Sequence, residues 1–432
     1  MTPQDQFTIL APVARESLAE LQKILQAMNA PSGLADPANQ LVPFGAFKGL
    51  HFARFVILDD PTLSDIEVYG IPRRELPVYL AFSGDCDGPA ARLLEEMCNR
   101  AGAGLRRIFT HCIGFDDTTE LIDWLLARVQ PPAAIYVNYV GRTVTQIVEE
   151  RRLQGALTAE VAKLPPPPEG GAEEQRCQLK DYVSKQLKSG GLTLTPARAT
   201  PLLWALRRCL NAIGVPLVSL LVAPLFLVLA PFLVVKLRRL EGADPEIWPR
   251  PSLDALRALQ AGEDVDVSNQ YTALGSLKPG LFRRTLLSVL LFYVNYFARH
   301  VFNRGFLARV QTIHFAHWVF MDRRLRLLFT SNYDGGHEAY MDDFINKAAW
   351  GLNLVFSSGV GWPKTDWLIR RGARREYQFK YFQRRHQLPT QVWYKAYPGL
   401  TLMDLKRNQA IRRGLERARM SNCQALAWLR LL

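Results

Sequence analysis

Two histidines occupy the same place in two stretches of nearly identical sequence. His51 opens HFARFVILDD, and His314 opens HFAHWVFMDR 263 positions later. An imidazole can transfer a proton near neutral pH or ligate a metal ion. His317 in the second stretch replaces Arg54 in the first, which gives an H-x-x-H pattern, but residues three apart on a strand point to opposite faces. The pattern therefore disfavours a chelating pair, and a buried hydrogen bond that the fold needs is the alternative role for His51 and His314.

Acidic residues hold equivalent places in the two halves as well. Asp87 lies in the motif GDCDG, and Asp334 lies in NYDGG, just before His337. Asp87 could accompany Arg54 at a cavity and take part in chemistry there. Both aspartates also stand between an expected strand and an expected helix, where Asp commonly caps free N–H groups. Capping is therefore the alternative role for the two aspartates. An exposed strand face is the alternative for Arg54, and a surface position is the alternative for His337.

The similarity between the two halves extends far beyond the decapeptide. Residues 79–115 align without a gap on residues 326–362. Upstream, FTILAPVA corresponds to YTALGSLK, and downstream AIYVNYVG corresponds to QVWYKAYPG, in the same order. Chance does not keep this order over so many elements, so the sequence indicates an internal duplication.

Apolar periodicity in the first copy predicts the element types for both. We expect strands at 7–13, 51–58, 79–83 and 108–115, with helices at 16–28 and 88–101, followed by a helix at 118–130 and a strand at 134–140. The order β-α-β-β-α-β is that of a ferredoxin-like unit. Because the open sheet face of such a unit needs a partner, the expected fold class is α+β, with two tandem ferredoxin-like repeats forming an intramolecular α+β barrel.

A tandem ferredoxin-like pair that carries G-x-x-D-G in GDCDG resembles the dimeric α+β barrel superfamily. Dye-decolourising peroxidases and chlorite-dismutase-like haem proteins belong to it. The resemblance implies a peroxidase-like oxidoreductase that binds haem, or a similar flat apolar ligand, between its sheets. By that carry-over Asp87 is the distal acid with Arg54 beside it. A histidine of the second half, His314 before His317 or His337, would then ligate the iron as the metal ligand.

A long apolar segment separates the two copies. Residues 209–235 comprise 27 residues without a charge, enough to cross a hydrocarbon core of about 30 Å, and basic residues flank both ends. Two halves of one barrel must lie on the same side of a membrane, and positive charge favours the cytoplasmic side. We therefore expect a re-entrant or in-plane helical hairpin bent near Pro224, with the soluble domains on the cytoplasmic face, unless the helix at 285–297 returns the chain. A buried core helix is the alternative, and the shorter run 285–297 suits a buried or interfacial helix.

The chain can be divided by composition. It is 48% apolar and 22% charged, which is typical of a globular protein. The expected parts are a first repeat at 1–162, a proline-rich linker at 163–200, a membrane segment at 201–240, a connector at 241–267, and a second repeat with a basic C-terminal extension at 268–432. The six cysteines form no CxxC pair, which fits a reducing compartment.

Charge indicates the kind of partner. Residues 364–419 contain 15 Lys or Arg against four Asp or Glu, nearly the whole net charge of +13. No recognition helix, zinc-ligand spacing or base-stacking motif accompanies them, so anionic lipid headgroups of a membrane are the expected partner in preference to nucleic acid. Three classes of function remain: a haem oxidoreductase, a non-catalytic lipid-binding or scaffold protein, and a cofactor-free enzyme. No P-loop, Rossmann fingerprint or nucleophile–base pair supports the third.

Overall fold

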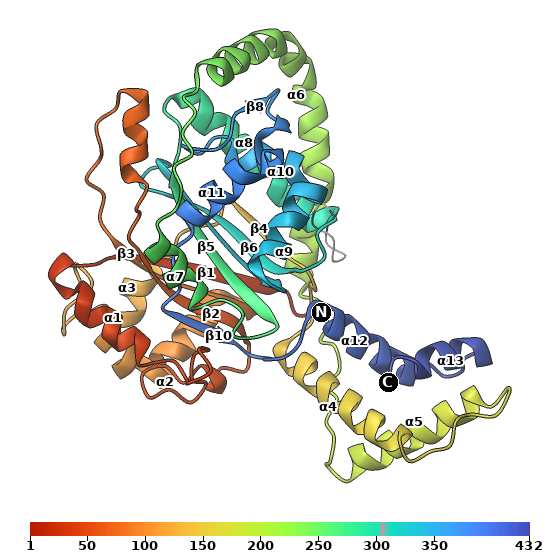
Figure 1. Ribbon diagram of the computed structural model, residues 1–432. Coiled ribbons are helices and arrows are strands. Elements are labelled where there is room, and N and C mark those ends of the chain that lie inside the picture. The colour runs from red at the N-terminus through yellow and green to blue at the C-terminus, as the bar shows by residue number, and fades with distance from the viewer. Residues whose placement is uncertain (303–306, 308) are drawn as a thin grey trace.

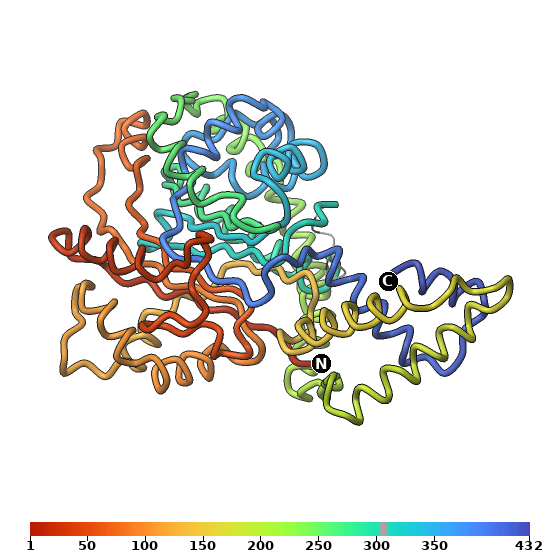
Figure 2. Tube along the Cα trace, turned by 60° about the horizontal axis from the view of Figure 1, so that its bottom comes forward, coloured from red at the N-terminus to blue at the C-terminus, as the bar shows by residue number. Residues whose placement is uncertain are grey.

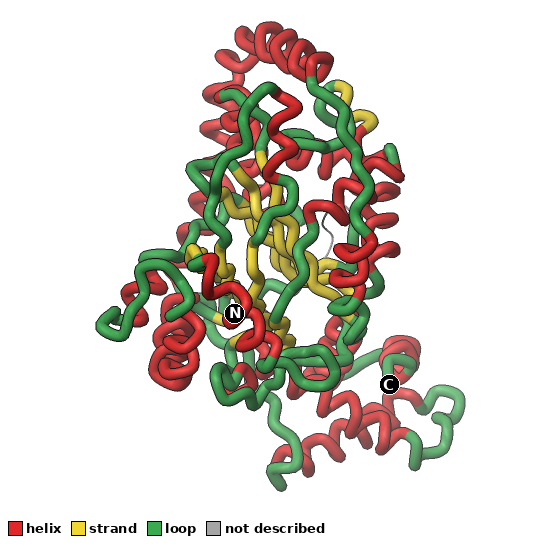
Figure 3. Tube along the Cα trace, turned by 60° about the vertical axis from the view of Figure 1, so that its left-hand side comes forward, coloured by secondary structure: helices red, strands yellow, loops and turns green. Residues whose placement is uncertain are grey.

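The computed structural model describes residues 1–302, 307 and 309–432. It contains two four-stranded antiparallel sheets that pack against each other and carry helices on their outer faces (Figure 1). One sheet has the strand order β1-β3-β2-β10 and the other has the order β4-β6-β7-β5. Figure 3 shows the strands enclosed by helices and loops. The expected α+β class is therefore confirmed.

The two halves contain matching elements. The first half consists of β1 (Gln4–Pro12), α1 (Leu18–Gln26), β2 (Leu50–Leu58), β3 (Tyr79–Asp87), α2 (Ala90–Phe109), α3 (Leu121–Leu126), β4 (Ala134–Val137), α4 (Val144–Val161) and α5 (Ala172–Lys188). The second consists of β5 (Ser268–Ser276), α8 (Leu281–His300), β6 (Ile313–Met321), β7 (Arg326–Asp334), α9 (His337–Asp343), α10 (Ala349–Phe356), α11 (Glu376–His386), β10 (Val392–Lys395), α12 (Leu402–Glu416) and α13 (Asn422–Leu429). Between them lie α6 (Leu202–Ala243) and α7 (Leu253–Gln260), and β8 (Thr365–Asp366) and β9 (Arg370–Arg371) form a small separate sheet.

Two expected local structures are wrong. The strand predicted at 108–115 does not form, because α2 continues to Phe109 and the turn after it makes one isolated bridge, from Val13 to Cys112. The buried residues Leu105, Ile108 and Phe109 continue the apolar face of α2 into the start of this stretch. The segment 163–200 is also more than a linker, since it contains the whole of α5.

The two halves exchange their last strands. The strand β4, from the first half, pairs antiparallel with β6 of the second, with Ala134 opposite Trp318. The strand β10, from the second half, pairs in the same way with β2 of the first, with Val392 opposite Phe55. Each sheet therefore holds three strands of one repeat and one of the other, and the two repeats cannot separate without breaking both sheets.

The expected barrel does not close: the two sheets pack against each other across an apolar layer, and isolated bridges alone connect their edges among the described residues. Before β4 joins the second sheet, its chain touches the edge of the first, where the Leu10 N–H donates to the Arg128 carbonyl. Before β10 joins the first sheet, the Leu388 N–H donates to the Thr272 carbonyl at the edge of the second. These contacts are isolated bridges, and across the described residues the two ladders remain separate sheets without closure.

Three apolar layers hold the body together. The helices α1, α2 and α3 cover the outer face of the first sheet, where Phe55 stacks on Phe82 at 4.3 Å between ring centroids. The helices α8 to α11 cover the outer face of the second sheet in the same way. Between the sheets lies a third layer that includes Leu10, Val56 and Leu328. Burial of such side chains contributes about 1.5–3 kcal/mol each.

Four helices project from one end of the two sheets (Figures 1 and 2). The pairs α4 with α12 and α5 with α13 pack around an apolar cluster that includes Leu153, Ile411 and Trp428. Both α4 and α12 begin with a capping box, in which Thr143 and Thr401 accept a backbone N–H from the third helical residue. The duplication therefore extends into this helical module.

The helix α6 is continuous from Leu202 to Ala243, so the expected hairpin at Pro224 is not formed. Figure 1 shows α6 running along one side of the second-sheet unit and curving over at its far end. Three prolines, Pro216, Pro224 and Pro231, lie inside it, and proline is the usual cause of a bend within a helix. The helix curves without reversing, and its two ends return to the same folded body.

Candidate functional site

A chain of six polar side chains crosses the centre of the molecule. His51 Nε2 lies 3.1 Å from Asp87 Oδ1, and His51 Nδ1 lies 3.2 Å from the Tyr397 hydroxyl. The second half repeats the arrangement, with His314 Nε2 2.6 Å from Asp334 Oδ1 and His314 Nδ1 3.4 Å from the hydroxyl of Tyr139. The two tyrosine hydroxyls contact each other. Each histidine thus joins an aspartate of its own half to a tyrosine of the other.

Backbone geometry places the two histidines at this centre. The register of β2 against β3 shifts between Leu50 and Phe52, so His51 is the extra residue of a β-bulge. The same shift occurs between Ile313 and Phe315 and makes His314 the extra residue of β6. Both bulges lie near the exchanged strands. The equivalence of the two histidines in the sequence therefore reflects a repeated structural position.

Both aspartates cap helices, although not the helices that directly follow them. Asp87 Oδ2 accepts the N–H of Val144, the first residue of α4, at 2.9 Å. Asp334 Oδ2 accepts the N–H of Leu402, the first residue of α12, at 2.7 Å. The contact with His314 and these hydrogen bonds lower the pKa of Asp334 in spite of its burial. The row of six polar side chains therefore connects the sheets to α4 and α12, the two helices that begin the projecting module.

The protons on the six polar side chains can be counted against the contacts between them. Five contacts link the six side chains, and each needs one proton to be a hydrogen bond. With ionised carboxylates and neutral imidazoles, the two imidazoles and the two hydroxyls supply four protons. In that state one of the five contacts therefore has no proton to share. Burial raises the pKa of Tyr139 and that of Tyr397 well above the ordinary value, so neither phenol loses its proton.

The resemblance implied that Arg54 lies beside Asp87, but the hydrogen bonds of Arg54 go to other residues. Its guanidinium crosses between the sheets and donates to the carbonyls of Tyr271 and Ser331, at 2.9 and 3.0 Å, and to the Asn332 side chain. Burial lowers the pKa of Arg54 to about 10, and the nearby Asp85 carboxylate opposes that shift. Arg54 therefore joins the two sheets.

His317, the counterpart of Arg54, makes the reciprocal contact. Its Nε2 lies 2.6 Å from Asp85 Oδ1, and Asn332 donates to the other oxygen of Asp85 at 3.1 Å. The expectation that His314 and His317 point to opposite faces is wrong, because the bulge at His314 changes the alternation of β6. His314 packs against Phe52 with 5.4 Å between ring centroids, so both histidines reach the first sheet.

His337 lies apart from both groups. It is buried, contrary to the surface position expected, and stacks on Tyr271 with 5.9 Å between ring centroids. Burial, with the positive charges of Arg384 and Lys380 nearby, lowers the pKa of His337 to about 3. A neutral imidazole in an aromatic stack is a packing element of the α9 N-terminus.

The residues expected to hold haem do not fit that group. A haem ligand needs an imidazole nitrogen that faces an open cavity. Both nitrogens of His314 are engaged, its side chain is fully buried, and the rings of Phe52, Tyr139 and Tyr397 pack against it. His317 binds Asp85 with one nitrogen, and His337 is stacked. No step through haem is derived from this arrangement.

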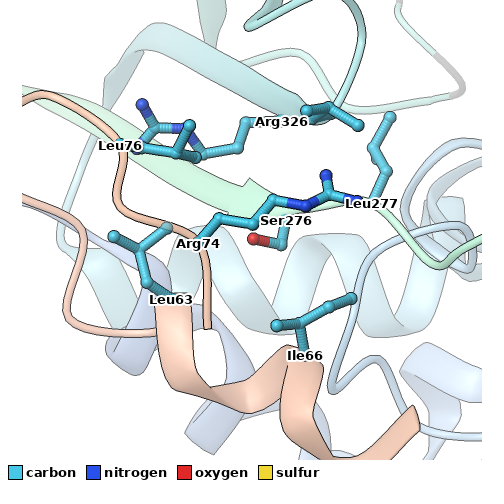
Figure 4. A pocket seen from close by; sticks show the side chains of 8 residues that line it. Leu63, Ile66, Arg74, Leu76, Ser276, Leu277 and Arg326 are labelled. Carbon is cyan, nitrogen blue, oxygen red and sulfur yellow. The ribbon is translucent and has the colours of Figure 1, made fainter. Parts of the chain in front are cut away.

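Two small pockets lie away from these residues. One, seen in Figure 4, lies between residues 63–76 and the second sheet and is lined by Leu63, Ile66, Arg74, Leu76, Ser276, Leu277, Leu325 and Arg326. Arg326 is held there by Asp322 at 2.6 Å. The other, largely apolar, lies beside His386 between β5 and α10. Asp87, Arg54 and the three candidate histidines line neither.

The helix α6 (Leu202–Ala243) presents a long exposed apolar surface. A stretch of this helix is long and apolar enough to cross a membrane, and none of the residues in that stretch is buried. Large apolar side chains stay exposed along its length, among them Leu206, Leu221, Leu227 and Phe232. In soluble proteins, large exposed apolar patches are commonly sites of contact with a membrane or another protein.

Polar contacts fix one side of α6 to α8 along the N-terminal half. The Tyr296 hydroxyl donates to the Ala212 carbonyl at 3.0 Å, and the Ser219 and Tyr293 hydroxyls lie 2.9 Å apart. His300 Nε2 lies 2.8 Å from the side-chain oxygen of Asn211. On its other side α8 packs into the core of the second-sheet unit through Leu287 and Leu291.

Two buried carboxylates fix the other end of α6. Glu241 accepts the Thr365 hydroxyl at 2.9 Å and the Leu368 N–H at 2.7 Å. Asp244, directly after the helix, binds Lys278 at 2.7 Å and Arg283 at 2.6 Å. Burial lowers the pKa of Lys278 to about 8, against the opposing effect of Asp244. Both ends of α6 are therefore anchored in the same body.

Sequence reasoning missed the partners that complete these groups. Tyr139 and Tyr397 lie in the equivalent segments NYVG and AYPG, and Asp85 and Asn332 are equivalent at the same offset as Asp87 and Asp334. Comparison of the two copies could therefore have singled out all four. The chain matches no family model, no curated protein and no solved structure.

Proposed function

We propose that this protein is a non-catalytic lipid-binding or scaffold protein of the membrane surface. Its apolar helix α6 attaches the α+β body to the bilayer, and the helical module of α4, α5, α12 and α13 projects from that body. The observation that carries the proposal is the exposed apolar surface of α6, which is anchored at both ends to a well-packed body. Basic flanks favour the cytoplasmic face.

The energetics support attachment. Transfer of one exposed Leu or Phe side chain out of water contributes about 1.5–3 kcal/mol, so a handful of such residues suffices for stable binding. The exposed apolar residues of α6 far exceed that number. An oxidoreductase that uses haem is less well supported, because its proposed ligands and distal residues are engaged in hydrogen bonds and packing.

Vesicle flotation tests the proposal. The full chain is expected to float with phospholipid vesicles, and a variant with Leu220→Gln, Leu221→Gln, Leu227→Gln and Phe232→Gln is expected to lose at least about tenfold in bound fraction. These four side chains are 72–80% exposed, so their loss leaves the core intact.

A matched control uses exposed apolar residues on other elements. Ile113→Gln, Tyr377→Gln and Met403→Gln remove side chains that are also more than half exposed. This variant is expected to bind vesicles as the unaltered chain does. Equal binding by both variants, or an unaltered chain that remains free of vesicles, would refute attachment through α6.

A further inference from the structure

Resting on the proposed membrane attachment, we infer that α6 lies in the plane of one anionic leaflet, on its side, and does not cross the bilayer. The helix and its neighbour α8 would form one lipid-facing layer, with the second-sheet unit behind it. The partner is therefore a surface of anionic phospholipid, and the whole body stays on one side of the membrane.

The contacts between α6 and α8 oppose a crossing. Asn211, Ala212 and Ser219 lie inside the uncharged run 209–235, and all three are bonded to α8. A crossing by that run would carry the bonded part of α8 into the hydrocarbon. The side of α8 that packs on the second sheet would be carried into the hydrocarbon as well. Polar backbone and side chains are costly in hydrocarbon.

Tryptophans mark both ends of α6 as interfacial. The Arg208 guanidinium lies 5.1 Å from the ring of Trp204, and that of Arg238 lies 5.1 Å from the ring of Trp367. Tryptophan beside a basic residue is typical of the headgroup level. Along its curved axis the helix rises about 51 Å between residues 204 and 238 at 1.5 Å per residue, which is longer than a hydrocarbon core of about 30 Å. An in-plane helix puts both pairs at one interface without strain.

The exposed charges complement an anionic leaflet. Residues 201–240 and 281–300 contain no Asp or Glu, whereas Arg207, Lys236 and Arg239 are exposed on α6. The one acidic side chain further along α6, Glu241, is buried. Basic groups at the level of the headgroups attract anionic lipid. The α8 surface adds exposed apolar side chains, such as Phe292, beside those of α6.

Depth-dependent quenching tests the orientation. A variant whose native cysteines are replaced by serine receives Leu206→Cys, Leu221→Cys or Phe232→Cys, each labelled with a fluorophore that lipid-borne spin labels quench. Ser219→Cys, on the side that contacts α8, is the matched control. The probe membrane is a vesicle of phosphatidylcholine with phosphatidylglycerol, compared with phosphatidylcholine alone.

An in-plane helix predicts the same shallow depth at the three lipid-facing positions, little quenching at position 219, and stronger binding to the anionic vesicles. A label at position 221 near the bilayer centre, with shallow labels at 206 and 232, would overturn the inference in favour of a span or hairpin and leave membrane attachment standing. Equal binding to both vesicles would overturn the anionic partner. Failure to bind either vesicle would refute the proposed function itself.

Discussion

The hydroxyl of Tyr139 lies against the hydroxyl of Tyr397, and this contact joins the two copies of the duplicated sequence at the centre of the molecule. Tyr139 follows β4 and Tyr397 follows β10, the two strands that the halves exchange. Strand exchange brings each tyrosine to the histidine of the other half. The polar chain and the exchanged strands are therefore two parts of one junction.

Removal of one tyrosine hydroxyl should destabilise the fold. Tyr139→Phe leaves His314 Nδ1 without its partner in a buried site, which typically costs about 1–3 kcal/mol. Tyr397→Phe should cost a similar amount through His51. Urea titration of each variant and of the double variant gives the free energies of unfolding.

The double variant is the sharper part of this experiment. Because the two hydroxyls share one contact, the two costs should not add, and the interaction energy should reach about 0.5 kcal/mol or more. Tyr377→Phe, at an exposed position on α11, is the control and should change the free energy of unfolding little. If the losses in free energy of unfolding from Tyr139→Phe and Tyr397→Phe were strictly additive, coupling through the contact of the two hydroxyls would be contradicted.

Removal of the Asp87 carboxylate should loosen the start of α4. Asp87→Ala takes away the acceptor of the Val144 N–H, and loss of a cap costs about 0.5–2 kcal/mol. Amide hydrogen exchange in the first turn of α4 should accelerate, while exchange at the start of α12, capped by Asp334, stays unchanged. Acceleration in α2 in place of α4 would show that Asp87 caps the helix that follows it in sequence.

The sequence predicted repetition well and long-range partners poorly. The equivalence of His51 and His314 and a capping role for Asp87 could be read from the pattern. Which helix Asp87 caps could not be read from the pattern, because α4 begins 57 residues after Asp87 and is brought to it by strand exchange. The nearer helix α2 is capped by Asp5, which accepts the Ala90 N–H. Local periodicity also assigned the end of α2 as a strand, since a buried apolar stretch fits either element.

The lowered pKa of Lys278 predicts that the free energy of unfolding increases with pH. Its pKa is about 8 in the folded protein, against 10.5 ordinarily, because burial disfavours the charge. Between these pH values the unfolded chain binds more protons than the folded one, so the free energy of unfolding increases as pH rises from about 8 to 10.5. In Lys278→Met this increase should be smaller, and Arg283 still pairs with Asp244. Parallel pH profiles of the two proteins would contradict the assignment.

His337 predicts a loss of stability in acid. Its pKa is about 3 when folded and 6.5 ordinarily, so below about pH 6.5 the unfolded chain takes up a proton that the folded protein does not. The free energy of unfolding should therefore fall as pH decreases from 6.5 towards 3. His337→Phe keeps an aromatic ring against Tyr271 and should lose less stability over this range. The comparison is made by urea titration at several pH values, and a steeper loss in the variant would contradict the buried neutral imidazole.

Haem provides the last prediction. Because both nitrogens of His314 are engaged and aromatic side chains fill the space around it, protein produced with ample haem should be colourless near the Soret band. His314→Ala should cost several kcal/mol of stability, since it leaves Asp334 and Tyr139 without their partner in a buried site. It should leave the absorbance spectrum unchanged. A stoichiometric Soret band in the unaltered protein, abolished by His314→Ala and kept in His337→Phe, would establish haem ligation by His314 and require the sheets to part around the cofactor.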